Sequence, residues 1–177
     1  MPERGDGLSS DGYRLRLARA MELLAADERV VFLGQGVRDP GTFMSQTLLG
    51  VPLEKRIELP VMEEAQMGMS IGLALAGAVP VTLYPRWNFL VLAANQLVNH
   101  VNVMRPRVIV RVGVGSRKPL DPGPQHVGDF TSAFRSMMPN TMIVALEHTH
   151  QIVPAYAAAL DRRGPTVLVE YMERYDA

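Results

Sequence analysis

Cysteine is absent from the sequence, which excludes disulfide bonds, thiolate metal sites and a cysteine nucleophile. An excess of charge is absent too, because 18 Lys and Arg residues balance 18 Asp and Glu residues. No overall field is therefore available to attract nucleic acid or an anionic membrane, and we expect neither as a partner. Hydrophobic residues make up 47% of the chain, too many for a disordered protein. Any function must reside in local sites.

The N-terminal sequence MPERGDGLSS has no apolar stretch of the kind found in secretory signals. Together with the lack of cysteine, this favours a cytoplasmic protein. A length of 177 residues suits one domain with a sizeable core. We expect a flexible tail over residues 1–9 and a single domain over 10–177, its first helix capped by Ser10 or Asp11.

One long stretch lacks charge entirely: no charged residue follows Glu64 until Arg86. At about 20 residues it is long enough to test as a membrane span. Gly77 and Pro80 interrupt it, however, and the pattern changes there from helical to β-branched. A buried helix followed by a buried strand is the better interpretation, and no membrane segment is expected.

Short apolar segments alternate with helical patterns along the whole chain. This alternation predicts an α/β fold of one domain, with a mostly parallel six-stranded sheet and helices on both faces. Helices are expected over 12–28, 42–50, 63–76, 88–104, 130–138 and 150–163, the last with Pro154 in its first turn. The expected strands are 29–34, 55–59, 79–84, 107–114, 141–146 and 166–171.

Ligands of such sheets bind where loops leave the carboxyl ends of the strands. Three segments meet this condition and also carry reactive or stacking side chains. They are the turn before Glu63, residues 84–89, and the loop over 114–128. Acids in a first helical turn are favoured by the helix dipole alone, and this reading is sufficient for Glu64.

The order of motifs from Tyr13 to Tyr171 resembles the pyrimidine-binding domain of thiamine-diphosphate enzymes. The resemblance is strongest to the beta subunit of the decarboxylating component of 2-oxo acid dehydrogenases. That transketolase-like family has a Pro, a Glu three residues later, and a helix with spaced glycines, followed by an Asn-Phe pair, a helix with an Asp-Gln…Asn pattern, and a histidine loop. The corresponding residues here are Pro60, Glu63, Gly68, Gly72, Gly77, Asn88, Phe89, Asn95, Gln96, Asn99 and the segment 123–126.

The resemblance implies roles for individual residues. Glu63 would hydrogen-bond the N1′ atom of the cofactor's aminopyrimidine ring, so that this ring can act as a base. Phe89 would pack against the ring, beside Pro85, which replaces a bulkier residue of the family. His126 would assist proton transfer or bind substrate together with Gln125, and Arg86 would hold a substrate carboxylate or phosphate. Plain structural roles remain the alternatives: core for Phe89, and exposed loop positions for Arg86 and His126.

Gly68, Gly72 and Ala76 recur every four residues and leave one helix face without bulk. Close packing inside the domain and a subunit boundary both require such a face. The histidines at 148 and 150 are read as structural or surface residues, since their spacing does not suit zinc. The Gly-Asp-Gly segment at 5–7 follows no strand and is discounted as a diphosphate site.

The sequence ends just after the last expected strand, without the diphosphate- and Mg²⁺-binding domain of these enzymes. We therefore expect a separate subunit to hold Mg²⁺ and the diphosphate, in an α2β2 heterotetramer. The predicted activity is decarboxylation or carboligation of a small 2-oxo acid or ketose-like donor. The alternative is a non-catalytic regulatory or scaffolding subunit, for which Pro85 and Asn95 in place of Asp are mild support. A general nucleotide-binding protein is disfavoured, because no glycine-rich phosphate loop follows a strand.

Overall fold

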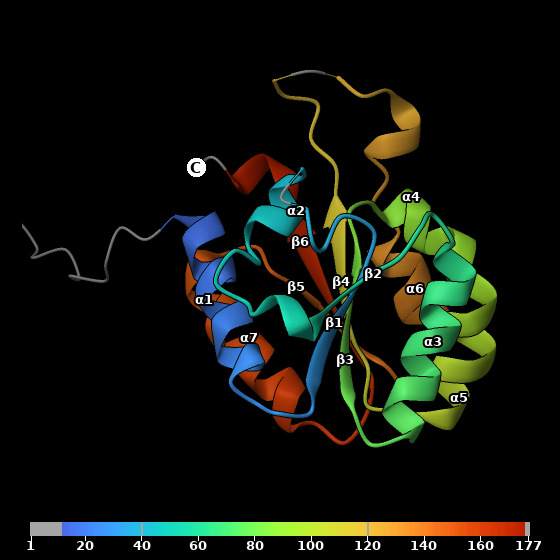
Figure 1. Ribbon diagram of the computed structural model, residues 1–177. Helices are drawn as coiled ribbons and strands as arrows, with labels where there is room; N and C mark the ends of the chain where they lie inside the picture. The colour runs from blue at the N-terminus through green and yellow to red at the C-terminus, as the bar shows by residue number, and fades with distance from the viewer. Residues whose placement is uncertain (1–11, 40, 120, 176–177) are drawn as a thin grey trace, which may run out of the picture.

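The computed structural model describes residues 12–39, 41–119 and 121–175 (Figure 1). The predicted tail over 1–9, the Gly-Asp-Gly segment and the predicted caps Ser10 and Asp11 lie outside these residues. In the part of the chain that is described, no helix is long and apolar enough to cross a membrane.

A six-stranded sheet forms the centre of the domain, in the order β2-β1-β3-β4-β6-β5. Every neighbouring pair is parallel, so the predicted fold is confirmed and the sheet is wholly rather than mostly parallel. All six residues of β3 are buried, as the continuous apolar sequence indicates. The strands are β1 (Val30–Gly34), β2 (Arg56–Glu58), β3 (Val79–Tyr84), β4 (Ile109–Val114), β5 (Met142–Ala145) and β6 (Thr166–Tyr171).

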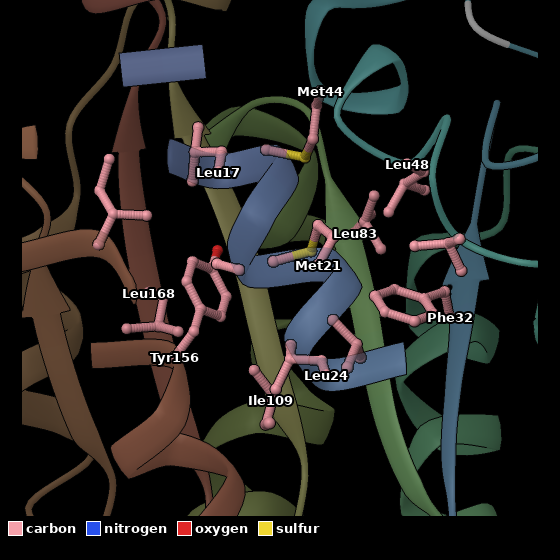
Figure 2. Close-up of a cluster of buried hydrophobic side chains, with 14 of the residues drawn as sticks. Leu17, Met21, Leu24, Phe32, Met44, Leu48, Leu83, Ile109, Tyr156 and Leu168 are labelled. Atoms are coloured by element: carbon pink, nitrogen blue, oxygen red, sulfur yellow. The ribbon is translucent and has the colours of Figure 1, made fainter. Parts of the chain in front are cut away.

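Helices cover both faces of this sheet (Figure 1). On one face α1 (Tyr13–Ala25) packs against α7 (Thr149–Asp161), next to the short α2 (Phe43–Gln46). Figure 2 shows side chains of α1 meeting those of the strands in this core. The second core lies on the other face, under α3 (Glu63–Leu75), α4 (Trp87–Leu90), α5 (Asn102–Met104) and α6 (Thr131–Met137).

Three helices differ from their predicted form. The helix expected over 42–50 is helical only over Phe43–Gln46, and residues 47–50 form turns. The helix expected over 88–104 is divided into α4, a 3-10 turn, a π-helical segment over Gln96–Val101, and α5. The wider π turn still keeps Leu97 and Val101 fully buried, so the apolar spacing that predicted one helix is satisfied. Helix α7 begins at Thr149, which places Pro154 in the second turn and not the first. The carbonyl that loses its hydrogen bond belongs to His150, an exposed residue, so water can replace the missing donor.

Candidate active site

The three loops selected from the sequence meet at the carboxyl edge of the sheet. They follow β2, β3 and β4, and β1 lies between β2 and β3. The loop after β1 therefore also belongs to the site, and its Gln35 and Gly36 line the cavity there. The sequence predicted this loop but not its place, because the order of strands in the sheet was not known.

Phe89 and His126 come together at this edge. Their rings meet edge to face, with centroids 5.6 Å apart and planes at 83°. Both side chains line a cavity of about 650 Å³, together with Pro85 and Arg86. Four of the predicted site residues, from two different loops, thus surround one space large enough for a small organic ligand.

Glu63 is half-buried at the start of α3 and lines a smaller adjoining space of about 10 Å³. Gln35, Pro85 and Phe89 line both this space and the cavity of about 650 Å³, so the two spaces adjoin. The hydroxyl of Tyr84 donates a hydrogen bond to the Glu63 carbonyl over 3.0 Å, which ties the first turn of α3 to the end of β3. Burial, with a contribution from the Glu63 carboxylate, raises the pKa of Tyr84, so this hydroxyl stays protonated.

Glu64 is exposed, and its side chain contacts the helical segment that follows α4. Its carboxylate accepts hydrogen bonds from the side-chain amides of Asn95, at 3.3 Å, and Gln96, at 3.4 Å. The amide of Asn99 in turn donates to Asn95 over 2.8 Å. The two neighbouring acids therefore lie in different environments. Glu63 lines the small space next to Phe89, and Glu64 holds the next helical segment against α3.

Of the remaining predicted site residues, Arg86 lines the cavity of about 650 Å³ and Gln125 does not. Arg86 is half-buried, and its Nη1 atom donates to the Pro85 carbonyl over 2.6 Å. Burial lowers the pKa of its guanidinium, which nevertheless stays charged at neutral pH. Gln125 is exposed on the short turn Pro124–His126 and lines none of the cavities described at this edge.

Glycines permit the close approaches that shape the site. A Cβ atom on Gly115 would lie 1.7 Å from the carbonyl oxygen of His126, so only glycine lets the histidine loop return against the end of β4. A Cβ on Gly113 would lie 2.5 Å from the Pro85 carbonyl oxygen. At Gly34, φ is +152° and a Cβ would lie 2.8 Å from the Leu83 carbonyl oxygen.

Other residues of the site were missed in the sequence. Gln66 is buried behind Glu63 and donates from Nε2 to the Thr82 hydroxyl at 2.8 Å and to the Leu83 carbonyl at 2.9 Å. Glu58 accepts hydrogen bonds from the backbone N–H groups of Gly36 and Arg38, which fixes the loop after β1. The sequence signal for Glu58 was an acidic residue at the end of β2, and the signal for Gln66 was a polar residue inside an apolar helix. Phe43 and Met172 complete the wall of the larger cavity.

The residue types suit the pyrimidine half of thiamine diphosphate, since a carboxylate and an aromatic ring border adjoining spaces in a mostly apolar setting, but the space of about 10 Å³ beside Glu63 is smaller than the ring. Among the residues described, no group of three His, Asp or Glu side chains is placed to hold a metal ion.

Comparison with known proteins identifies related sequences and a family. The family model for the pyrimidine-binding domain of transketolase matches residues 13–176. The pyruvate dehydrogenase E1 component subunit beta-2, chloroplastic, of Arabidopsis thaliana is 27% identical over 98% of this chain and 46% of its own length. The subunit beta-4, chloroplastic, of Oryza sativa subsp. japonica is 26% identical over 99% of this chain and 47% of its own length. The chain thus spans about half the length of the curated relatives it matches.

Solved structures share the fold. The transketolase from Leishmania mexicana superposes with a TM-score of 0.75 and 21% identity, over 90% of this chain and 25% of that one. A split-gene transketolase, solved as an inactive beta4 tetramer, gives a TM-score of 0.72 and 16% identity, over 90% of this chain and 50% of that one. The match to the family model covers nearly the whole sequence, and the predicted resemblance is confirmed: the chain belongs to the transketolase pyrimidine-binding domain family.

Proposed function

We propose that this chain is the pyrimidine-binding subunit of a heteromeric thiamine-diphosphate enzyme that decarboxylates or ligates a 2-oxo acid or ketose-like donor. One observation carries the proposal: Glu63, Phe89 and His126, to which the sequence resemblance assigns roles, border two adjoining spaces at the carboxyl edge of the sheet. Names of the curated relatives, which are E1 beta subunits of pyruvate dehydrogenase, support the 2-oxo acid class.

When bound, thiamine diphosphate supplies the carbon nucleophile and the electron sink that this chemistry requires. Glu63 would hold a proton on the N1′ atom of the pyrimidine ring, and Phe89 would pack against that ring. His126, in edge contact with Phe89, would exchange a proton with the substrate's oxygen atom. Arg86 would bind the substrate carboxylate and orient it in the cavity of about 650 Å³ that Phe89 and His126 line. Gln125 is proposed to contact substrate only when a partner chain covers its loop.

A partner chain would carry Mg²⁺ and the diphosphate, because the described residues offer no metal cluster. The surface that we assign to it, called the α3 face, comprises Met62, Gly68, Gly72, Leu75 and Leu92. Apart from the adjoining residues and backbone of α3 itself, no described atom lies within 4 Å of a Cβ built on either glycine, so Gly68 and Gly72 leave room for close approach from outside. Met62 is 41% exposed, Leu75 65% and Leu92 61%.

This face is continuous with the site. Met62, Gly68 and Leu92 line a shallow groove that also includes Glu63. A subunit that covers the α3 face therefore reaches the carboxylate that the cofactor needs. We propose that the partner is the diphosphate-binding subunit and that the assembly is an α2β2 heterotetramer. The cytoplasm is our proposed compartment; the curated relatives carry chloroplastic names, and cell fractionation separates these two locations.

The test is to co-express the chain with its diphosphate-binding partner and to measure cofactor binding and 2-oxo acid turnover. Glu63→Gln is expected to lower turnover at least about 100-fold, the usual scale for loss of a general acid-base group. Glu54→Gln is the matched control, since this exposed carboxylate lies in the short turn Leu53–Lys55 before β2, away from the carboxyl edge of the sheet, and turnover should stay within about twofold. Full turnover in the Glu63→Gln complex would refute the assigned role.

The second candidate is a non-catalytic subunit that kept the fold. The observation that favours it is the size of the space beside Glu63, which at about 10 Å³ does not admit a pyrimidine ring without movement. Under this candidate the complex assembles but thiamine diphosphate does not bind it. Calorimetric titration of the assembled complex with thiamine diphosphate and Mg²⁺ decides between the two.

A further inference from the structure

A second cavity, larger than the one that Phe89 and His126 line, opens beside it. It has a volume of about 1350 Å³ and shares three of its lining residues with the cavity that holds Phe89 and His126. The shared residues are Phe43, Arg86 and Met172. A ligand that reacts near His126 can therefore extend past Arg86 into this second space.

The lining of the second cavity is strongly cationic. Arg86, Arg117, Lys118 and Arg174 line it, and Glu173 is the one carboxylate among its described lining residues. This local excess contrasts with the balanced charge of the whole chain. Such a cavity concentrates anions, and arginine side chains offer paired donors that match the oxygens of phosphate-like and carboxylate groups.

Partners inside the described part of the chain engage the cations of this cavity only in part, and Arg86 donates to the Pro85 carbonyl from Nη1. The Nε atom of Arg174 is buried and has no hydrogen-bond partner there. Its guanidinium carbon lies 5.9 Å from the centre of the Tyr171 ring, which orients the side chain without neutralising it. Arg117 pairs with Asp121 at 2.7 Å, but both side chains are more than half exposed, so that pair is weak and can yield to a ligand.

We propose that the second cavity binds an oxyanion at the remote end of the substrate, which makes the substrate a 2-oxo acid with a second anionic group. The acid carboxylate binds at Arg86, and a phosphonate, phosphate, sulfonate or second carboxylate binds among Arg117, Lys118 and Arg174. The orientation of the substrate rests on the function proposed above. The capacity of the cavity to bind an oxyanion does not depend on it.

The first experiment uses the full chain alone and a nuclear magnetic resonance titration. The probes are 3-phosphonopyruvate, 2-oxoglutarate and pyruvate, which differ in their second anionic group. We expect one of the first two to bind at least about tenfold more tightly than pyruvate, a factor typical of one charge-assisted contact. The backbone amides of Gly115 and Arg174 should shift. The tighter of the two probes identifies the anion, and equal affinity for all three overturns the inference.

A charge-matched pair of variants locates the binding. Arg117→Gln with Lys118→Gln removes two exposed cations from the cavity and should weaken the preferred probe about tenfold or more. Arg162→Gln with Arg163→Gln removes two exposed cations beyond α7, at the other end of the sheet, and should leave the affinity unchanged. Equal weakening by both pairs indicates only a general charge effect and overturns the assignment.

The second experiment separates this inference from the proposed function. In the assembled complex, the ratio of kcat/KM for the preferred probe over pyruvate should fall about tenfold in the Arg117→Gln, Lys118→Gln variant, mainly through KM. An unchanged ratio in a complex that turns over pyruvate normally overturns the inference. A complex without cofactor-dependent turnover refutes the proposed function, while the titration of the single chain still tests the anion cavity.

Discussion

At the scale of single residues, Gly115 controls where His126 lies. The histidine loop passes so close to Gly115 that any side chain there would collide with the carbonyl of His126. A backbone atom, unlike the end of a flexible side chain, cannot move aside cheaply. The glycine therefore acts on the site through main-chain geometry, although it has no functional group of its own.

Gly115→Ala is predicted to lower the free energy of unfolding by about 1–3 kcal/mol, the usual cost of overpacking, and to displace His126 from Phe89. Denaturant unfolding measures the first effect, and a crystal structure of the variant measures the second. Gly164→Ala is the control, because its new Cβ would meet only Arg162 Nε at 3.7 Å. A Gly115→Ala protein with normal stability and an unmoved His126 would contradict the argument.

At the scale of elements, a buried ion pair joins the strands behind the site. Arg111 on β4 and Glu170 on β6 are fully buried, with Nε and Oε1 2.7 Å apart. The hydroxyls of Tyr156 on α7 and Tyr175 after β6 also donate to Glu170, and Arg111 Nη2 donates to the Thr47 hydroxyl at 3.0 Å. Burial lowers the pKa of Arg111, but Glu170 and both tyrosines more than offset this, so the guanidinium stays charged.

This network fixes the chain end that lines both cavities. Tyr175 packs against Phe43 with ring centroids 6.2 Å apart, and Met172 and Arg174 lie in the same short turn. Both Phe43 and Met172 belong to the wall shared by the two cavities. Through these contacts the buried pair positions residues of the site without touching a ligand.

Removing one member of the buried Arg111–Glu170 pair is predicted to destabilise the protein strongly. Arg111→Met leaves the Glu170 carboxylate buried without its counter-ion and should lower the free energy of unfolding by about 3–5 kcal/mol. The double variant Arg111→Met, Glu170→Leu removes both charges and should recover most of that loss. Chemical denaturation of the wild type, both single variants and the double variant measures the coupling. Additive effects would mean that the two charges do not stabilise each other.

At the scale of the whole molecule, the two faces of the sheet are used differently. The face under α1 and α7 is closed by packing within the chain (Figure 1, Figure 2). On the other face, the outer side of α3 has open glycines and exposed apolar side chains beside Glu63. This asymmetry suits a subunit that completes its site only on association.

Gly72→Leu is predicted to weaken association with the diphosphate-binding partner at least about tenfold, because bulk is added where close approach is required. The isolated chain should be no less stable, since a Cβ at this exposed position enters open space and leucine favours helix over glycine by up to about 1 kcal/mol. Native mass spectrometry and thermal unfolding give the two readouts. Ala158→Leu, exposed on α7, is the control. Unchanged affinity in Gly72→Leu would exclude the α3 face as the interface.

Local patterns in the sequence determined the elements and the family. Side-chain periodicity depends on neighbours a few residues apart, so all six strands were predicted, with ends within two residues of those observed. The motif order gave Glu63, Phe89 and His126, and the structure brings the last two into contact. The same patterns could not reveal the π-helical segment, because an extra residue in one turn hardly changes apolar spacing.

Only the tertiary structure decided which distant segments meet. It placed β1 between β2 and β3, which adds Gln35 and Gly36 to the site. It also brought Arg174, from the last turn, to the same cavity as Arg86 and Arg117, and paired Arg111 with Glu170. Such contacts depend on strand order and long-range packing, for which a single sequence carries no periodic signal. The sequence therefore determined the elements and the family, and the tertiary structure decided the shape and charge of the space at the carboxyl edge of the sheet.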